Sequence, residues 1–270
     1  MRLFTSKKGW LQIPIKKERR DSYEPLTDED VMKLINYILY SPDYPPSNLP
    51  EEASQLYRLR NSAMIAMFWL FGKRLTEVLS LKTEDVWIDG DELKVRFKIL
   101  KKSKKYKKCR FCEELNSRRA NFCKKCGRSL SDAELVKVGQ ELPVRIKRKS
   151  LLNRFVSYIL MWMEERKKHP SGYFFPPLST VGKLEHDGKL VDVKLLPTRM
   201  MSRANVWYIL DEFGLTPHLF RYGFAKSLLI KTHGDLRLVK EAGDWSSLDM
   251  LMEYAKSLGT TEEDEKFSRL

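Results

Sequence analysis

The sequence predicts a mostly α-helical protein with a small antiparallel β-sheet. Several segments place apolar residues at the helical spacing of about 3.6 residues, both in the first 80 residues and after residue 150. The stretch between them holds short runs of alternating apolar residues, which are typical of strands. With 270 residues, 42% of them hydrophobic, the chain can bury one large core or two modest ones.

Two long helices are predicted near the N-terminus, after a basic tail at residues 1–25 that has no consistent period. LTDEDVMKLINYIL has Thr27 as its N-cap and three acidic residues in the first turn, where the helix dipole favours negative charge. Its apolar stripe consists of Val31, Leu34, Ile35, Ile38 and Leu39. EEASQLYRLRNSAMIAMFWLFG becomes apolar nearly all round, which predicts a buried helix that ends at Gly72. A short helix, RLTEVLSL, should follow.

The middle of the chain predicts a β-hairpin with an insertion at its tip. DVWIDGDELKVRFKIL contains two strands joined by a turn at Asp89 and Gly90, and ELPVRI, residues 141–146, is a further strand. A lysine-rich run and all four cysteines lie between them. The simplest interpretation places residues 105–132 as an inserted lobe in the hairpin, with lysines on its outgoing strand.

The cysteine spacing predicts a zinc site. Cys109 and Cys112 form one Cys-x-x-Cys pair, and Cys123 and Cys126 form a second pair after ten intervening residues. Such knuckles each supply two thiolates to one tetrahedral ion, whereas a disulfide framework would spread cysteines through a short secreted chain. The segment resembles a zinc ribbon. With four protein ligands the Zn²⁺ would be structural and not catalytic.

The C-terminal part predicts five helices. SLLNRFVSYILMWMEERKK, starting at Ser150, carries one apolar face: Leu151, Leu152, Phe155, Ile159 and Met163. A surface loop is expected over residues 176–195, followed by the amphipathic segment TRMMSRANVWYILDEFG. TPHLFRYGFAKSLLIKTHG should begin with Thr216 as cap and Pro217 as first helical residue. LRLVKEAG and SSLDMLMEYAKSL complete the domain.

The charge indicates a polyanionic partner. Fifty basic against 36 acidic residues give a formal net charge of +14, which favours nucleic acid or an anionic membrane surface. No apolar stretch approaches the roughly 20 residues that a membrane span requires, and the N-terminus has no continuous apolar signal segment. We therefore expect an intracellular, cytoplasmic protein that binds nucleic acid.

Four short motifs occur in a characteristic order. The first is GKRLTEVLSL, which contains Arg74, and a lysine-bearing hairpin follows it. HLFRYGF then contains His218 and Arg221, three positions apart and on one helical face, and GDWSSLDMLMEY is the last. Trp245 lies 24 positions after Arg221, and Tyr254 lies nine positions after Trp245. Each residue alone has an ordinary structural explanation, but the joint order and spacing over residues 26–256 resemble the tyrosine recombinase (phage integrase) family.

That resemblance implies a catalytic-domain fold at residues 26–270 and a set of roles. Tyr254 would attack a DNA phosphate and form a 3′-phosphotyrosine, while Arg74 and Arg221 would clamp the phosphate oxygens. His218 would act as general base or hydrogen-bond the same oxygens, and no catalytic cofactor would be needed. Within the family, the sequence looks most similar to members that carry a zinc ribbon, as archaeal plasmid and virus integrases can. The implied partner is double-stranded DNA, with assembly into dimers or tetramers on it.

Two positions depart from the family's usual pattern. Trp245 stands where histidine is most frequent, and its indole N–H can donate to a phosphate oxygen but cannot shuttle a proton. The hairpin lysine that would protonate the leaving 5′-oxygen is ambiguous, and Lys102 matches best among four: Lys98, Lys101, Lys102 and Lys104. The helical N-terminal clamp domain found in many family members has no counterpart among the 25 residues that precede the catalytic domain.

Three functions remain open on the sequence alone. The first is a recombinase that integrates or excises a mobile element. The second is a topoisomerase that relaxes supercoils with the same covalent chemistry. The third is a non-catalytic zinc-ribbon DNA-binding protein, which would have no need for a tyrosine at the observed spacing.

Overall fold

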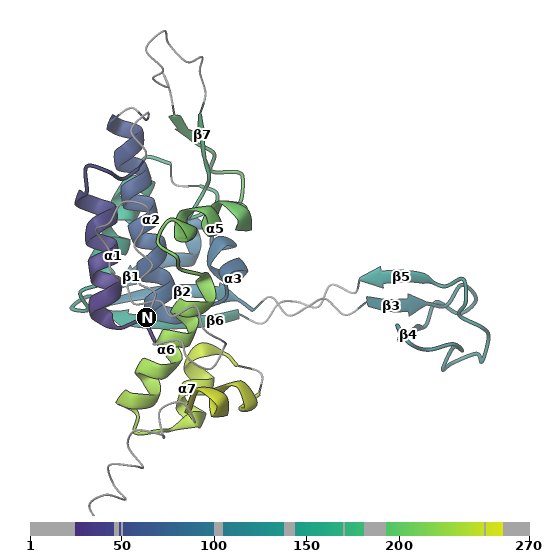
Figure 1. The fold of residues 1–270 in the computed structure, drawn as a ribbon. Coiled ribbons are helices and arrows are strands. Elements are labelled where there is room, and N and C mark those ends of the chain that lie inside the picture. The colour runs from purple at the N-terminus through teal and green to yellow at the C-terminus, as the bar shows by residue number, and fades with distance from the viewer. Residues whose placement is uncertain are drawn as a thin grey trace, which may run out of the picture. The chain divides into compact units, whose positions relative to one another are not determined.

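The computed structural model describes residues 25–45, 49, 51–99, 105–137, 144–169, 171–180, 193–245 and 247–255. The chain divides into two compact units. We call Met1–Phe97 with Ile146–Leu270 the core domain, and Lys98–Arg145 the cysteine lobe. Figure 1 shows the helices of the first unit and the short strands of the second. The predicted basic tail lies, except for Pro25, outside the described residues.

The first helices of the core domain match their prediction. Helix α1 (Asp28–Tyr40) begins with Thr27 as N-cap, in a reciprocal capping box with Asp30. Helix α2 (Glu51–Phe71) is buried along its whole second half, and Gly72 with φ +56° ends it. The short helix α3 (Leu75–Leu79) follows after Lys73 and Arg74.

A three-stranded sheet of order β1-β2-β6 packs within the core domain. Strands β1 (Val86–Asp89) and β2 (Glu92–Lys98) form an antiparallel hairpin, after the 3₁₀ turn η1 (Thr83–Asp85). Strand β2 alternates between buried and partly exposed side chains, with Leu93, Val95 and Phe97 fully buried. Strand β6 (Val144–Ser150) lies beside β2, so the expected hairpin with an insertion between its strands is confirmed.

The remaining elements are mostly helices. They are α4 (Val156–Arg166), the strand pair β7 (Leu178–Thr180) and β8 (Val193–Leu195), α5 (Arg203–Asp211), α6 (Pro217–Lys231) and α7 (Leu236–Gly243). Residues 249–255 are also helical. Among the described residues, no helix is long and apolar enough to cross a membrane.

Two expectations for the chain after Ser150 need correction. Helix α4 begins at Val156 and not at Ser150, because Asn153 starts a turn in which its side chain accepts from the amide of Phe155. Leu152 therefore lies in that turn with 95% of its surface exposed, and it is not part of the apolar face. The segment expected to be a loop at 176–195 contains the antiparallel pair β7 and β8.

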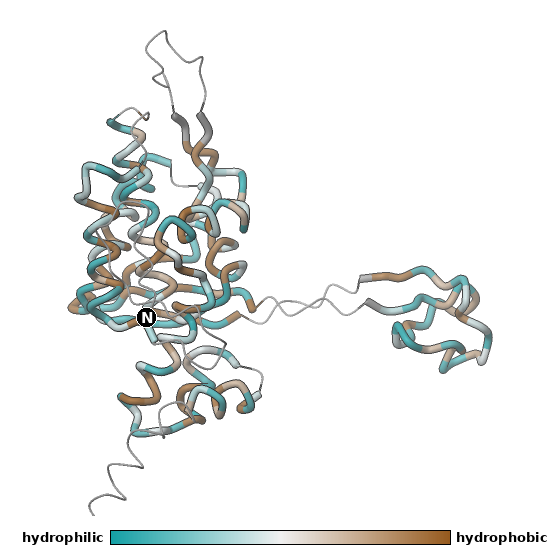
Figure 2. Tube along the Cα trace, in the orientation of Figure 1, coloured by the Kyte–Doolittle hydropathy of each residue, from teal (hydrophilic) through white to brown (hydrophobic). Residues whose placement is uncertain are grey.

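The core domain has two hydrophobic clusters. The larger one joins α1, α2, α4 and the sheet, and Figure 2 shows the apolar residues gathered along these elements. The smaller cluster joins α6, α7 and the last helical segment, and its buried members are Phe224, Ala225, Leu229, Val239, Trp245, Leu251 and Tyr254. Two of the predicted site residues thus belong to the smaller cluster.

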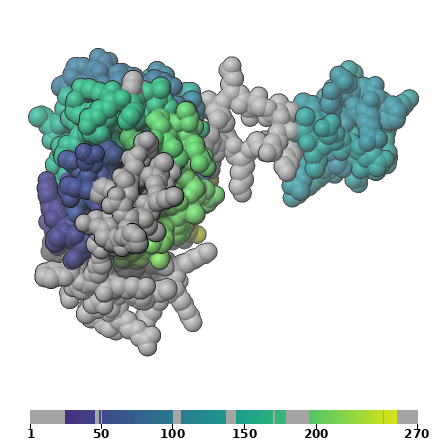
Figure 3. Space-filling model, turned by 90° about the horizontal axis from the view of Figure 1, so that it is seen from above, coloured from purple at the N-terminus to yellow at the C-terminus, as the bar shows by residue number. Residues whose placement is uncertain are grey.

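The cysteine lobe is a compact body of its own (Figure 3). Its strands β3 (Lys105–Lys108), β4 (Leu115–Ser117) and β5 (Glu134–Lys137) form a second antiparallel sheet of order β4-β3-β5. The buried hydrophobic cluster within it consists of Cys109, Cys123 and Leu130. Apolar burial among the described residues of the lobe is therefore very limited.

Candidate active site and metal centre

Arg221 on α6 connects three segments of the predicted site. Its guanidinium donates to the carbonyl of Gly72, beside Arg74, and to the carbonyl of Gly243 at 3.0 Å. The same guanidinium lies 4.0 Å above the ring of Trp245. Burial lowers the pKa of Arg221 to about 10, and the nearby charge of Arg74 adds to that effect. Arg221 therefore stays charged at neutral pH while it holds the segments together.

Arg74 is the exposed member of the arginine pair. It precedes α3, and 43% of its side chain is accessible. Its Nη1 lies 3.1 Å from Oε1 of Glu77, and its backbone N–H donates to the second oxygen of the same carboxylate at 3.0 Å. Glu77 is itself 1% exposed, so it forms a fixed anchor. The guanidinium is oriented at the surface, where a phosphate can reach it.

Trp245 follows α7 and lies beneath Arg221. It is 5% exposed, and its indole N–H has no hydrogen-bond acceptor within the described part of the chain. Buried donors are rarely left unpaired, because an unmet donor costs roughly 1–3 kcal/mol. Phe224 of α6 stacks on the indole with ring centres 6.4 Å apart and fixes its plane. An anion that accepts from this N–H would relieve the cost.

Tyr254 lies in the last helical segment. It is 7% exposed, and its ring packs edge-on against Tyr222 of α6 with centroids 4.7 Å apart. Burial raises the pKa of Tyr254, while the charge of Arg221 acts in the opposite direction. The phenol is therefore protonated at neutral pH.

The other two predicted catalytic positions are less informative. His218 is exposed in the first turn of α6, one turn before Arg221 and on the same helical side. Lys102 lies outside the described residues, as do Lys101 and Lys104. Lys98, at the end of β2, is exposed. The choice of hairpin lysine thus stays a prediction.

Two glycines permit the close approach of these segments. A Cβ atom at Gly72 would lie 2.1 Å from the ring of Phe224, and the φ of +56° there also disfavours side chains. A Cβ atom at Gly243 would lie 1.6 Å from the ring of Trp245. Glycine at both positions therefore lets these rings pack against the backbone whose carbonyls accept from Arg221.

Sequence reasoning missed three charged residues beside the site. Lys73 is 2% exposed, and its ammonium donates to Asp244, which also contacts Lys147 of β6 at 3.3 Å. Burial, followed by repulsion from Lys147, lowers the pKa of Lys73 to about 7, and the carboxylate of Glu77 opposes that shift. The only signal in the sequence was the position of Lys73 and Asp244, each directly beside a predicted site residue.

The four cysteines converge in the lobe, and their ligand atoms all lie within 4.8 Å of one another. The Sγ atoms of Cys109 and Cys126 are 3.6 Å apart, and those of Cys112 and Cys123 are 3.5 Å apart. A tetrahedron with zinc–sulfur bonds of about 2.3 Å has edges of about 3.8 Å, so the sulfur positions fit a tetrathiolate ion. These four residues can bind a metal such as zinc.

Backbone donors support the thiolate form at this centre. The amides of Lys125 and Cys126 point at Cys123, with the Lys125 nitrogen 3.4 Å from Sγ. The Cys126 amide, as the largest cause, lowers the pKa of Cys123 to about 6. The Asn116 side chain adds a further donor at 3.6 Å. Such amide bonds to sulfur are the usual surroundings of bound thiolates.

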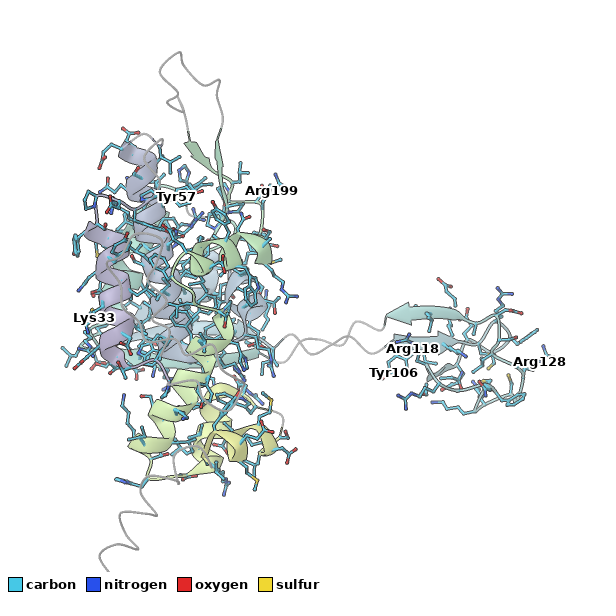
Figure 4. The ribbon with its side chains drawn as sticks, in the orientation of Figure 1. Lys33, Tyr57, Tyr106, Arg118, Arg128 and Arg199 are labelled. Carbon is cyan, nitrogen blue, oxygen red and sulfur yellow. The ribbon has the colours of Figure 1, made fainter. Side chains whose placement is uncertain are left out.

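The surface of the lobe is strongly cationic. Residues 105–137 contain ten Lys/Arg against four Asp/Glu. Figure 4 shows Arg118 and Arg128 toward opposite ends of the lobe, so the basic residues are distributed over it. Arg128 lies 4.0 Å over the ring of Phe111, which is 64% exposed. The lobe combines positive charge with exposed aromatic surface.

The fold of this chain resembles those of solved recombinase structures. The XerH site-specific recombinase bound to a palindromic difH substrate, a post-cleavage complex, aligns with 91% of this chain and 53% of its own, at TM-score 0.52 and 18% identity. Its pre-cleavage complex with difH aligns with 86% and 49%, at TM-score 0.48 and 19% identity. The Tn1549 transposon integrase in complex with circular intermediate DNA aligns with 88% and 62%, at TM-score 0.44 and 10% identity.

These likenesses are structural. No family model matches the sequence, and no curated protein matches it. The chain spans about half the length of the XerH chains, 49% and 53%. At 18% identity and TM-score 0.52, the likeness to the post-cleavage complex of XerH is a likeness of fold. The chain therefore has the fold of a tyrosine recombinase.

Proposed function

We propose that this chain cuts and rejoins DNA strands as a site-specific tyrosine recombinase, such as an integrase or excisionase of a mobile element. The observation that carries the proposal is the position of Arg221. This one buried guanidinium bonds the backbone beside Arg74 and the backbone beside Trp245, and it lies over the indole. Residues 149 and 22 positions away in sequence are thereby brought to one place.

In this mechanism Tyr254 is the nucleophile. Its phenolic oxygen attacks the phosphorus, the bond to the 5′-oxygen breaks, and a 3′-phosphotyrosine with a free 5′-hydroxyl results. Because burial raises the pKa of Tyr254, the phenol must lose its proton during the attack. His218, exposed one turn from Arg221, is the proposed acceptor of that proton or a donor to the phosphate. The reverse attack by a 5′-hydroxyl rejoins the strand.

The two arginines and the indole stabilise the charge that develops on the phosphate. Arg74, oriented by Glu77, and Arg221 present planar forks that match two nonbridging oxygens and remain charged. The N–H of Trp245, which has no acceptor elsewhere in the described chain, would donate to one of the same oxygens. All proposed roles belong to side chains, so we expect cleavage without a divalent cation.

A lysine of the hairpin is the proposed general acid for the leaving 5′-oxygen. Lys102 is our choice, against Lys98, Lys101 and Lys104. A substrate with a 5′-bridging sulfur needs little protonation on departure. It should restore cleavage only in the variant that lacks the acid.

Double-stranded DNA is the proposed partner, and the net charge of +14 supports it. The core domain would bind the phosphate to be cut, and the cysteine lobe would add a second contact to the backbone. Zn²⁺ bound by Cys109, Cys112, Cys123 and Cys126 would hold the lobe in shape and take no part in catalysis. Strand exchange needs more than one active site, so we also propose assembly into dimers or tetramers on DNA.

The test is covalent trapping of DNA. The protein is incubated with a nicked suicide duplex, and a protein–DNA band that survives denaturation is expected. Tyr254→Phe should abolish the band and leave duplex binding nearly unchanged, because the hydroxyl is the nucleophile while charge elsewhere drives binding. Tyr222→Phe, on the ring that packs against it, is the matched control. An adduct formed by Tyr254→Phe would refute the assignment.

A topoisomerase with the same covalent step is the second candidate function. Both enzymes form the adduct, so a different measurement separates them. Relaxation of a supercoiled plasmid without any preferred sequence would favour the topoisomerase. Exchange between two copies of one site would favour the recombinase. A non-catalytic DNA-binding protein would form no adduct with either substrate.

A further inference from the structure

A buried ion pair joins the segment of Arg74 to the segment of Trp245. Lys73, directly before Arg74, donates its ammonium to one carboxylate oxygen of Asp244, directly before Trp245. The side chains are 1% and 9% exposed, respectively. A pair this deep pays a large desolvation cost, so it is poor evidence for stability alone and suggests a positional role.

Asp244 is held from a second side. The ammonium of Lys147 lies 3.3 Å from the other carboxylate oxygen of Asp244 and donates to the carbonyl of Glu241 at 2.8 Å. The carboxylate thus binds the turn after α2 with one oxygen and strand β6 with the other. Glu77 and the cations Arg74 and Arg221 are the further charged groups that act on Lys73.

The backbone at Asp244 is also unusual. It caps α7 in the left-handed conformation, with φ +52° and ψ +47°. A non-glycine residue there is disfavoured, although Asp and Asn tolerate it better than most. Glycine would serve the turn equally well but would lack the carboxylate. The advantage of aspartate over glycine at position 244 is therefore its carboxylate.

We propose that Lys73, Asp244 and Lys147 form a positioning clamp that fixes Arg74 and Trp245 relative to each other, so that both face the same phosphate. The proposal rests on the function proposed above. Arg221 ties the same two segments by their carbonyls, at Gly72 and Gly243. The clamp ties them a second time, one residue further along each segment. With both the Arg221 hydrogen bonds and the Lys73–Asp244 ion pair in place, the two segments cannot rotate relative to each other as they could with one connection alone.

The clamp should act on rate and not on DNA affinity. Displacing a catalytic group by about 1 Å can cost on the order of 100-fold in rate. Lys73→Met removes the charge with little change in length, and Asp244→Asn retains the shape and tolerates the backbone conformation. We expect each to slow adduct formation at saturating DNA by about 10- to 100-fold, with duplex Kd changed less than about 3-fold because binding comes from many phosphate contacts.

Two readouts separate positioning from a merely structural effect. Trp245→Phe removes the indole N–H, and in that background Asp244→Asn should cost much less than in the native chain, because it acts through that N–H. Lys149→Met is the control, since Lys149 lies two residues further along β6 and its ammonium lies over the ring of Phe71, 6.0 Å from its centre. Fully additive effects, or an equal loss with Lys149→Met, would overturn the proposal.

Hydrogen exchange tests the clamp independently of catalysis. Amides of residues 72–75 and 241–245 should exchange faster in Lys73→Met and Asp244→Asn than in Lys149→Met. Unchanged exchange in these segments would overturn the clamp whatever the activity. Exchange at residues 72–75 and 241–245 could rise in these variants although the native protein forms no adduct with DNA. In that case the clamp would still fix the two segments, but the proposed function would be wrong. The two failures are thus distinguishable.

Discussion

The core domain and the cysteine lobe achieve a fixed shape by different means. In the core domain large side chains such as Trp162 and Phe220 are fully buried. In the lobe the buried cluster is two cysteines and one leucine. A hydrophobic core of that size cannot offset the entropy of ordering the chain, so we expect a metal ion bound by the four converging cysteines to supply the remaining stability. The comparison suggests that each unit fails under a different perturbation.

The two units also differ in how far their cationic side chains are buried. Arg221 and Lys73 in the core domain are almost completely buried and bonded to specific acceptors. In the lobe Arg110 and Arg118 are exposed. Buried, oriented charge controls a reaction at one point, whereas exposed charge attracts a polyanion over a distance set by salt. The core should therefore govern rate and the lobe affinity.

Metal removal should have the largest effect, and it should be confined to the lobe. Structural zinc in small domains contributes roughly 10–16 kcal/mol of apparent binding energy, so the metal-free lobe should lose its structure. Chelation or Cys123→Ser should abolish amide protection at residues 105–137, leave protection in α2 and α6 unchanged, and still allow adduct formation. Returning zinc should restore protection after chelation only. Loss of protection in α2 would contradict the independence of the units.

Truncation of one phenylalanine in each unit should show the opposite pattern. Phe220 is 0% exposed within the larger cluster, so Phe220→Ala should cost about 3–5 kcal/mol of unfolding free energy. Phe122 is 67% exposed in the lobe, and Phe122→Ala should change that free energy by less than about 0.5 kcal/mol. Urea unfolding followed by helical circular dichroism measures the core domain, and amide protection at residues 105–137 under the same conditions measures the lobe. Similar losses would mean that the lobe depends on apolar burial after all.

The sequence was sufficient for most of the fold, because local signals and packing agree there. Thr27 caps α1, Gly72 ends α2, and Pro217 opens α6, as their residue types indicate. The error at Leu152 arose because an apolar period continued across a turn that the Asn153 side chain stabilises. Periodicity cannot reveal such a local hydrogen bond.

The candidate site was only partly predictable. The order of the motifs was enough to predict four site residues: Arg74, Arg221, Trp245 and Tyr254. The burial of Lys73 and its contact with Asp244 could not be predicted, because they depend on how segments distant in sequence pack together. A lysine directly beside a site arginine in sequence ordinarily indicates an exposed cation. The general acid stayed undetermined for another reason: several adjacent lysines satisfy the same pattern.

Loss of an arginine of the site should slow the reaction without weakening binding in proportion. Arg74→Ala should reduce the rate of adduct formation at saturating DNA by on the order of 100-fold or more, from lost stabilisation of the phosphate. Arg74→Lys should also be slow, because an ammonium cannot reproduce the bidentate fork. Arg74 is the better test than Arg221, since it is 43% exposed and its change risks the fold less. A near-normal rate with Arg74→Lys would refute the proposal that Arg74 stabilises the phosphate through a bidentate contact.

Single exposed cations of the lobe should have the smallest effects, and these should be on affinity alone. Arg110 is exposed, so Arg110→Ala should weaken duplex binding and reduce the slope of log K against log salt by about one, as one lost phosphate contact predicts. Lys108 lies 3.0 Å from the carboxylate of Glu113, so part of its charge is already neutralised, and Lys108→Ala should reduce the slope less. Adduct formation at saturating DNA should be unchanged in both variants. Titrations of duplex DNA at several salt concentrations distinguish the two variants. A changed rate of adduct formation with an unchanged slope of log K against log salt would mean that the lobe takes part in catalysis, which would contradict the division of roles between the two units.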